Sequence, residues 1–186
     1  MHALLATSDA IKKLLEIIAH ASGWLLIVLM SITCIDIFGR KLGIPIPLTK
    51  FQELEWHLHT AVFSMWMGYN YTINAHPRVD SYTETLKYRN KAYIEFWGCL
   101  LFAIPYTGLL VYHGWDFFWT SYIQNERSEN AIGLEHRWLI KGVFYIGLWL
   151  VLLGVASVLL RLIVFLFGRR PQEEVNLQIG HAELEV

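Results

Sequence analysis

The chain has 186 residues, of which 55% are hydrophobic and 17% are charged, and its formal net charge is −1 at pH 7. This near-neutral balance lacks the basic excess that nucleic-acid binding needs, so we predict no nucleic-acid partner. Four stretches of about twenty residues contain no charged side chain, and each can cross the roughly 30 Å hydrocarbon core of a bilayer as a helix. They are residues 17–35, 56–75, 96–115 and 142–160.

Each uncharged stretch is predicted to be helical, because lipid offers no hydrogen-bond partner to unpaired backbone groups. The predicted fold class is therefore all-α, an integral membrane protein with four transmembrane helices. We place a four-helix membrane domain at residues 1–168, with spans at about 15–38, 50–75, 92–119 and 138–167, and a polar cytoplasmic tail at residues 169–186. Residues 1–13 lack the features of a cleaved signal peptide, so the first span is expected to remain in the mature protein.

The first span ends in a pair of opposite charges, Asp36 and Arg40. Their i, i+4 spacing allows an ion pair within one helix. The pair either only ends the span or anchors it to Glu53 or Glu55 on the next helix, or to a partner protein. The residues themselves leave these readings open.

The second span opens with two glutamates and two histidines, whose residue types suggest a metal site: Glu53, Glu55, His57 and His59. Helical geometry separates them into the pairs Glu53–His57 and Glu55–His59, which point about 200° apart. Neither pair alone completes a four-ligand shell. We therefore predict structural or interfacial roles for these side chains, with no metal.

Membrane histidines raise one alternative function, a haem b-binding membrane anchor subunit of an oxidoreductase. His57 or His59 could pair with His113 at similar depth, whereas His20 has no matching partner. No nucleophile, base and orienting group occur at a recognisable spacing, and no glycine-rich phosphate loop is present. We predict no cofactor and no enzymatic activity.

The segment that joins the second and third spans carries apolar and aromatic residues at roughly helical spacing between residues 79 and 93. This pattern is typical of a short interfacial helix lying at the membrane surface. The third span contains Pro105, which should free the carbonyl group of Leu101 and kink the helix.

The fourth span carries Gly147 and Gly154, seven residues apart on one face, and small residues at this spacing permit close contact with another helix. Mid-span positions throughout the chain are almost wholly apolar. A polar solute needs polar groups at depth, and secondary transporters typically contain internal repeats, which this sequence lacks. A small autonomous transporter is therefore only an alternative.

Basic residues are distributed unevenly between the two sides of the predicted bundle. The side that holds both termini and the 76–95 loop carries nine, and the other side carries six. The positive-inside rule then predicts that both termini are cytoplasmic.

Sequence motifs in and after the second span resemble the small membrane subunit of tripartite ATP-independent periplasmic (TRAP) transporters, the DctQ-like family. The residues that carry the resemblance are the run Glu53-Leu-Glu-Trp-His-Leu, the triplet Met67-Gly68-Tyr69, and His76-Pro77-Arg78-Val79-Asp80. The Asp36-x-x-x-Arg40 ending of the first span and the Arg137–Lys141 start of the fourth are also similar. The resemblance covers about residues 17–165.

The resemblance implies a scaffold subunit in the bacterial inner membrane. Its partners would be membrane lipid, a large M-type membrane subunit that holds the sodium sites and substrate path, and a periplasmic substrate-binding protein that delivers an organic acid. The small subunit would also contribute to the docking surface for that binding protein. The candidate structural and interface residues are Asp36, Arg40, Glu53, Glu55, Gly68, His76, Arg78, Asp80, Gly147 and Gly154.

Overall fold

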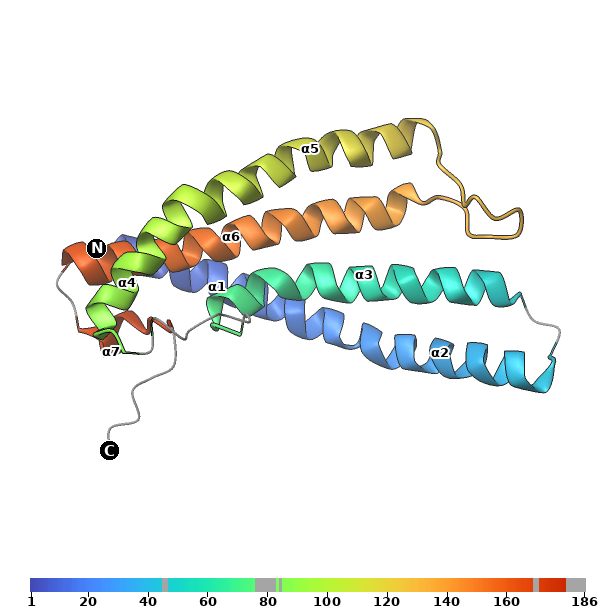
Figure 1. The fold of residues 1–186 in the computed structure, drawn as a ribbon, viewed down its shortest axis with the longest axis horizontal. Helices are drawn as coiled ribbons and strands as arrows, with labels where there is room; N and C mark the ends of the chain where they lie inside the picture. The colour runs from blue at the N-terminus through green and yellow to red at the C-terminus, as the bar shows by residue number, and fades with distance from the viewer. Residues whose placement is uncertain (45–46, 76–82, 84, 169–170, 180–186) are drawn as a thin grey trace. The chain divides into compact units, whose positions relative to one another are not determined.

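The computed structural model describes residues 1–44, 47–75, 83, 85–168 and 171–179, and every regular element within them is helical (Figure 1). The elements are α1 (His2–Gly23), α2 (Leu25–Leu42), α3 (Leu48–Thr72), α4 (Tyr88–Gly98), the π-helical turn η1 (Cys99–Ala103), α5 (Ile104–Ile123), α6 (Trp138–Gly168) and α7 (Gln172–Val175). The all-α prediction is confirmed for this part of the chain.

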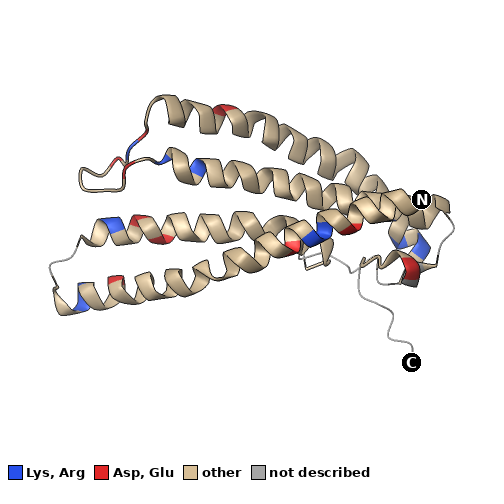
Figure 2. Ribbon diagram, turned by 180° about the vertical axis from the view of Figure 1, so that it is seen from behind, with Lys and Arg blue, Asp and Glu red and all other residues tan. Residues whose placement is uncertain are grey.

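Three helical segments of the described chain are long and apolar enough to cross a membrane: His2–Leu42, Tyr88–Ile123 and Trp138–Gly168. Figure 2 shows long uncharged stretches along α5 and α6. Helix α3 has sufficient length, at 25 residues, but it is not one of the three. Its sequence mixes histidine and asparagine with the apolar residues and starts with three charged ones. The predicted count of four spans is therefore not confirmed.

The interfacial helix predicted between residues 79 and 93 is not tested, because residues 76–82 and 84 lie outside the described part of the chain. Helix α4 begins at Tyr88 and continues through η1 into α5. This continuous helical segment contains the third predicted span.

The first predicted span, residues 15–38, is interrupted where α1 ends at Gly23 and α2 begins at Leu25. The carbonyl oxygen of Ala19 accepts a hydrogen bond from Trp66 Nε1 at 2.8 Å and another from Ser22 Oγ at 2.9 Å. At the junction itself, the Trp24 N–H donates to the Ala21 carbonyl at 3.4 Å and the Ile27 N–H donates to the Trp24 carbonyl at 3.2 Å, so both bonds have i, i+3 spacing. Two side chains thus contact the last turn of α1 next to the break.

The irregularity expected at Pro105 takes the form of the π-helical turn η1, which ends two residues before the proline. Pro105 has no N–H group to donate to Leu101, and its ring crowds the carbonyl group of that residue. Wider π-helical winding over Cys99–Ala103 accommodates this change within the segment.

The chain divides into two compact units, and helices α1, α3, α5 and α6 each have residues in both. Unit 1 comprises Met1–Glu16, Met67–Leu109 and Leu150–Val186, and unit 2 comprises Ile17–Trp66 and Leu110–Trp149. The core of unit 1 consists of buried residues from α4, η1, α6 and the C-terminal segment: Ala92, Cys99, Val155, Val158, Leu162, Val164, Leu166, Val175, Leu177 and Ile179.

Residues 169–186 were predicted to form a polar tail, but the described part of this segment buries apolar side chains. Its described part contains α7, and Val175, Leu177 and Ile179 are at most 4% exposed. Alternate residues of a short polar segment therefore complete the core of unit 1.

Unit 2 contains a ladder of aromatic side chains on α5 and the start of α6. The rings of Trp115 and Trp119 stack at a centroid distance of 5.4 Å, and Phe118 stacks on Tyr145 at 6.3 Å. Outside the packed faces, large apolar side chains such as Trp24, Phe102 and Tyr112 remain more than 70% exposed. Exposed apolar surface of this kind is typical of helices that face lipid or another membrane helix.

Candidate functional site

Glu53, in the second turn of α3, is the centre of a hydrogen-bonded site in unit 2. Its carboxylate accepts hydrogen bonds from Ser128 Oγ, from Asn130 Nδ2 at 2.9 Å and from the backbone N–H of Leu134 at 2.6 Å. All three donors belong to the loop between α5 and α6. The carboxylate therefore fastens this loop to the start of α3.

The fastened loop has a defined conformation of its own. The Ser128 N–H donates to the Leu134 carbonyl at 3.1 Å, and the Gly133 N–H donates to the Asn130 carbonyl at 3.0 Å. A Cβ atom added at Gly133 would lie less than 3.0 Å from atoms of Ser128 and from Glu53 Oε1. Only glycine leaves room at this position for the carboxylate to reach its donors.

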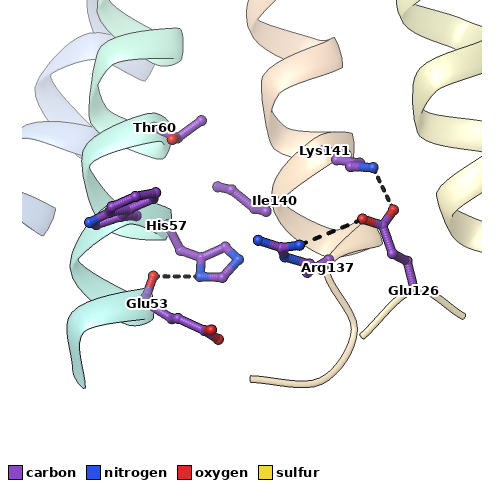
Figure 3. Close-up of a pocket in the computed structure, with 8 residues that line it drawn as sticks. Glu53, His57, Thr60, Glu126, Arg137, Ile140 and Lys141 are labelled. Atoms are coloured by element: carbon purple, nitrogen blue, oxygen red, sulfur yellow. Dashed lines mark hydrogen bonds and ion pairs between the residues drawn. The ribbon is translucent and has the colours of Figure 1, made fainter. Parts of the chain in front are cut away.

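A pocket of about 280 Å³ lies beside Glu53 (Figure 3). It is lined by α3, by the loop and by the start of α6: Glu53, Trp56, His57, Thr60, Glu126, Arg137, Ile140 and Lys141. In Figure 3 the imidazole of His57 lies between α3 and α6, and its Nδ1 atom is 2.7 Å from the carbonyl oxygen of Glu53.

Glu126 forms the second charged centre of this pocket. Lys141 Nζ donates to its carboxylate, and Arg137 Nη1 lies 3.9 Å from it. The hydrogen bond from Lys141 is the main cause that lowers the pKa of Glu126 below its ordinary value of 4.5. Lys141 Nζ also lies 4.2 Å from the centroid of the Phe117 ring, so a cation–π contact adds to the ion pair.

The charges of the pocket are balanced, because two carboxylates face two basic side chains. Both carboxylates already accept hydrogen bonds. The arrangement therefore stabilises the conformation of the pocket and leaves little charge to attract a free ion. Among the described residues, no group of three or more His, Cys, Asp or Glu side chains is placed to hold a metal ion.

Asp36 and Arg40 form the intrahelical ion pair that their spacing predicts. Arg40 Nε donates to one carboxylate oxygen at 2.8 Å and Nη2 donates to the other at 3.0 Å. Asp36 is 7% exposed. Arg40 also lies 3.4 Å from Gln52 Oε1 and interacts electrostatically with Glu55, both on α3. The pair thus reaches the next helix through Gln52, whereas the reading that it anchors to Glu53 or Glu55 stays a prediction.

The three glycines among the candidate structural and interface residues lie where α3 and α6 meet. In unit 1, a Cβ atom at Gly68 would collide with the Leu150 carbonyl, and one at Gly154 would collide with the Gly68 carbonyl. In unit 2, a Cβ atom at Gly147 would lie 2.9 Å from the Ser64 carbonyl oxygen. Gly147 and Gly154 were candidates for contact with a partner; in the structure they contact α3 of the same chain.

Three remaining candidates, His76, Arg78 and Asp80, lie outside the described residues. The structure adds site residues that sequence reasoning did not select, above all Ser128, Asn130 and Glu126. The 121–136 loop is polar and mixed in charge, but nothing in its spacing pointed to Glu53, which lies more than 70 residues earlier.

Comparisons with known proteins identify a family. The model of the family described as "Tripartite ATP-independent periplasmic transporters, DctQ component" matches residues 29–165. No curated protein and no solved structure matches the chain. The matched region includes the Asp36–Arg40 pair, the Glu53 site and all three packed glycines. Because the match covers well over half of the sequence, the chain belongs to the DctQ family, a small membrane component of TRAP transporters.

Proposed function

We propose that this chain is the small permease subunit of a sodium-coupled TRAP transporter for an organic acid, a carboxylate or sulfonate. In this proposal a large M-type membrane subunit holds the sodium sites and the substrate path, and this chain is its scaffold in the bacterial inner membrane. The observation that supports this role is the uncharged, closely packed course of α6. Between Lys141 and Arg161, α6 carries no charged residue, and Gly147 and Gly154 lie against the backbone of α3. A path for a polar solute would need polar groups at that depth.

We also propose that α3 crosses the membrane as the fourth span. Its 25 residues would extend about 37 Å, which exceeds the thickness of the hydrocarbon core. Its close glycine contacts with α6 support a place beside a membrane helix. The proposed topology has both termini in the cytoplasm and residues 40–50 and 120–137 in the periplasm, in line with the nine-to-six distribution of basic residues.

The loop that Glu53 fastens is proposed to form part of the docking surface for the periplasmic substrate-binding protein. Three side chains of this loop remain more than half exposed, Ile132, Arg127 and Glu135. A loop that is already ordered loses less conformational entropy when a partner binds. Its hydrogen bonds to α3 therefore favour a docking role.

Reconstitution into liposomes tests the proposed function directly. Sodium-driven uptake is measured with the large subunit and the binding protein, with and without this chain. We expect uptake only when all three are present, and none from this chain alone. Full uptake without the chain, or uptake by the chain alone, would overturn the scaffold role. Ile132→Asp should weaken binding-protein association, and Leu42→Asp, at an exposed apolar side chain outside this loop, serves as the control.

A further inference from the structure

A buried guanidinium group in unit 1 connects three segments of the chain. Arg161, on α6, is 6% exposed. Its Nε atom donates to Ser8 Oγ of α1 at 2.9 Å, and its Nη2 atom donates to Asp9 Oδ1. Its Nη1 atom donates to the carbonyl oxygen of Val175 and, at 3.3 Å, to that of Asn176. The C-terminal segment thus accepts two of the four hydrogen bonds of a buried cation.

Ser8, which accepts a hydrogen bond from Arg161, also joins α1 to α6. Ser8 Oγ lies 2.8 Å from Ser157 Oγ and 3.0 Å from the Ser157 carbonyl oxygen. Lys12, one turn further along α1, interacts unfavourably with Arg161 because both are cations. Among the described residues, the carboxylate that forms an ion pair with Arg161 is that of Asp9, whose side chain is 65% exposed. The carbonyl groups of the C-terminal segment are therefore needed to compensate Arg161.

The C-terminal segment binds in the way an extended peptide binds a groove. Helix α7 ends at Val175, and Asn176 takes the left-handed conformation with φ of 47°, which turns the chain. Val175, Leu177 and Ile179 then occupy the core, and the hydroxyl group of Tyr88 donates to the Leu177 carbonyl at 2.6 Å. Alternate apolar anchors and backbone hydrogen bonds are the elements of such recognition.

We propose that residues 174–179 are a latch that compensates the charge of Arg161 and thereby holds α1 on α6. When the latch detaches, two donors of a buried guanidinium lose their acceptors, and the α1 contact loosens. A buried charge that loses one partner is strongly destabilising, whereas replacing the charge itself by an apolar group can be neutral or stabilising. We therefore expect an apolar substitution of Arg161 to destabilise the chain when the latch is present and to stabilise it when the latch is absent.

The test is a double-mutant cycle on the full chain in detergent, read by melting temperature and by hydrogen exchange of α1 near Ser8. One truncation ends after Pro171 and removes the latch; a control truncation ends after Ile179 and keeps it. We expect the control to behave as the full chain. We expect loss of the latch to lower the melting temperature by about 5 °C or more and to speed exchange near Ser8 about tenfold or more.

Arg161→Met supplies the decisive arm of the cycle. It should lower the melting temperature of the full chain but raise that of the chain truncated after Pro171. If that truncated chain does not fold, Arg161→Met should restore its folded yield, and added peptide of residues 171–179 should do the same. Equal effects of Arg161→Met in both backgrounds, or unchanged exchange near Ser8 after truncation, would overturn the latch.

Discussion

The Glu53 carboxylate accepts hydrogen bonds from residues that lie 75 to 81 positions further along the chain. Such charge-assisted bonds are among the stronger polar contacts of a protein, and a donor that loses its acceptor in a sheltered place costs additional free energy. The backbone N–H of Leu134 donates to this carboxylate. One side chain therefore determines the conformation of a whole loop.

Glu53→Ala should loosen the loop between α5 and α6. Because the site is partly open to solvent, we expect a loss of about 1–2 kcal/mol of stability. Hydrogen exchange should accelerate at Ser128–Leu134, where the lost bonds begin and end. Glu129→Ala is the matched control, since Glu129 is an exposed carboxylate of the same loop. Unchanged hydrogen exchange in Glu53→Ala would show that the carboxylate does not order the loop.

Stability should also depend on pH through Glu126. Its pKa is lowered in the folded chain, chiefly by the hydrogen bond from Lys141. A group with a lowered pKa stabilises the fold at pH values above its ordinary pKa of 4.5, and the contribution is lost as the pH falls through the lowered value. Melting curves of the natural chain and of Glu126→Gln should therefore differ most near pH 7 and converge in acid. A difference that grows as the pH falls would contradict this sign.

Helices α3 and α6 approach each other closely because glycine removes the side chain where the backbones meet. Gly68 lies against the Leu150 carbonyl, and Gly154 lies against the Gly68 carbonyl, all within unit 1. In lipid, helix association depends on van der Waals contact, and small residues at the interface permit it. The glycine of the motif Met67-Gly68-Tyr69, which resembles the family, is thus also required for the packing of α3 on α6.

Gly68→Ala and Gly154→Ala should each destabilise the chain, because the new Cβ atom meets backbone that cannot move aside. Overpacking of this kind typically costs about 1–3 kcal/mol. Gly98→Ala and Gly108→Ala are matched controls, since a Cβ atom at either helical position would have no neighbour within 4 Å. These controls should be neutral or gain up to about 1 kcal/mol from helix propensity. Equal melting temperatures for all four variants would show that the glycine contact is loose.

The four proposed spans fix a topology that can be measured on the whole molecule. Single cysteines at Asn90 and Glu129, in a chain without Cys34 and Cys99, should react differently with an impermeant thiol reagent in intact cells. Both positions are exposed, and Asn125 is less suitable because it has φ of 44° and its Oδ1 atom is 2.9 Å from His136 Nδ1. We expect labelling at position 129 and none at position 90. The opposite pattern would invert the proposed orientation.

Composition and motif were enough to predict helices, the family and the Asp36–Arg40 pair, because each depends on residue types and local spacings that can be read along the chain. Pro105 likewise marked its own irregularity, although not its π-helical form. Sequence could not reveal three hydrogen bonds: from Trp66 to the Ala19 carbonyl, from Ser128 to the Glu53 carboxylate, and from Arg161 to the Val175 carbonyl. These contacts join residues 14 to 75 positions apart, and only the packing of the folded helices brings such residues within hydrogen-bond distance.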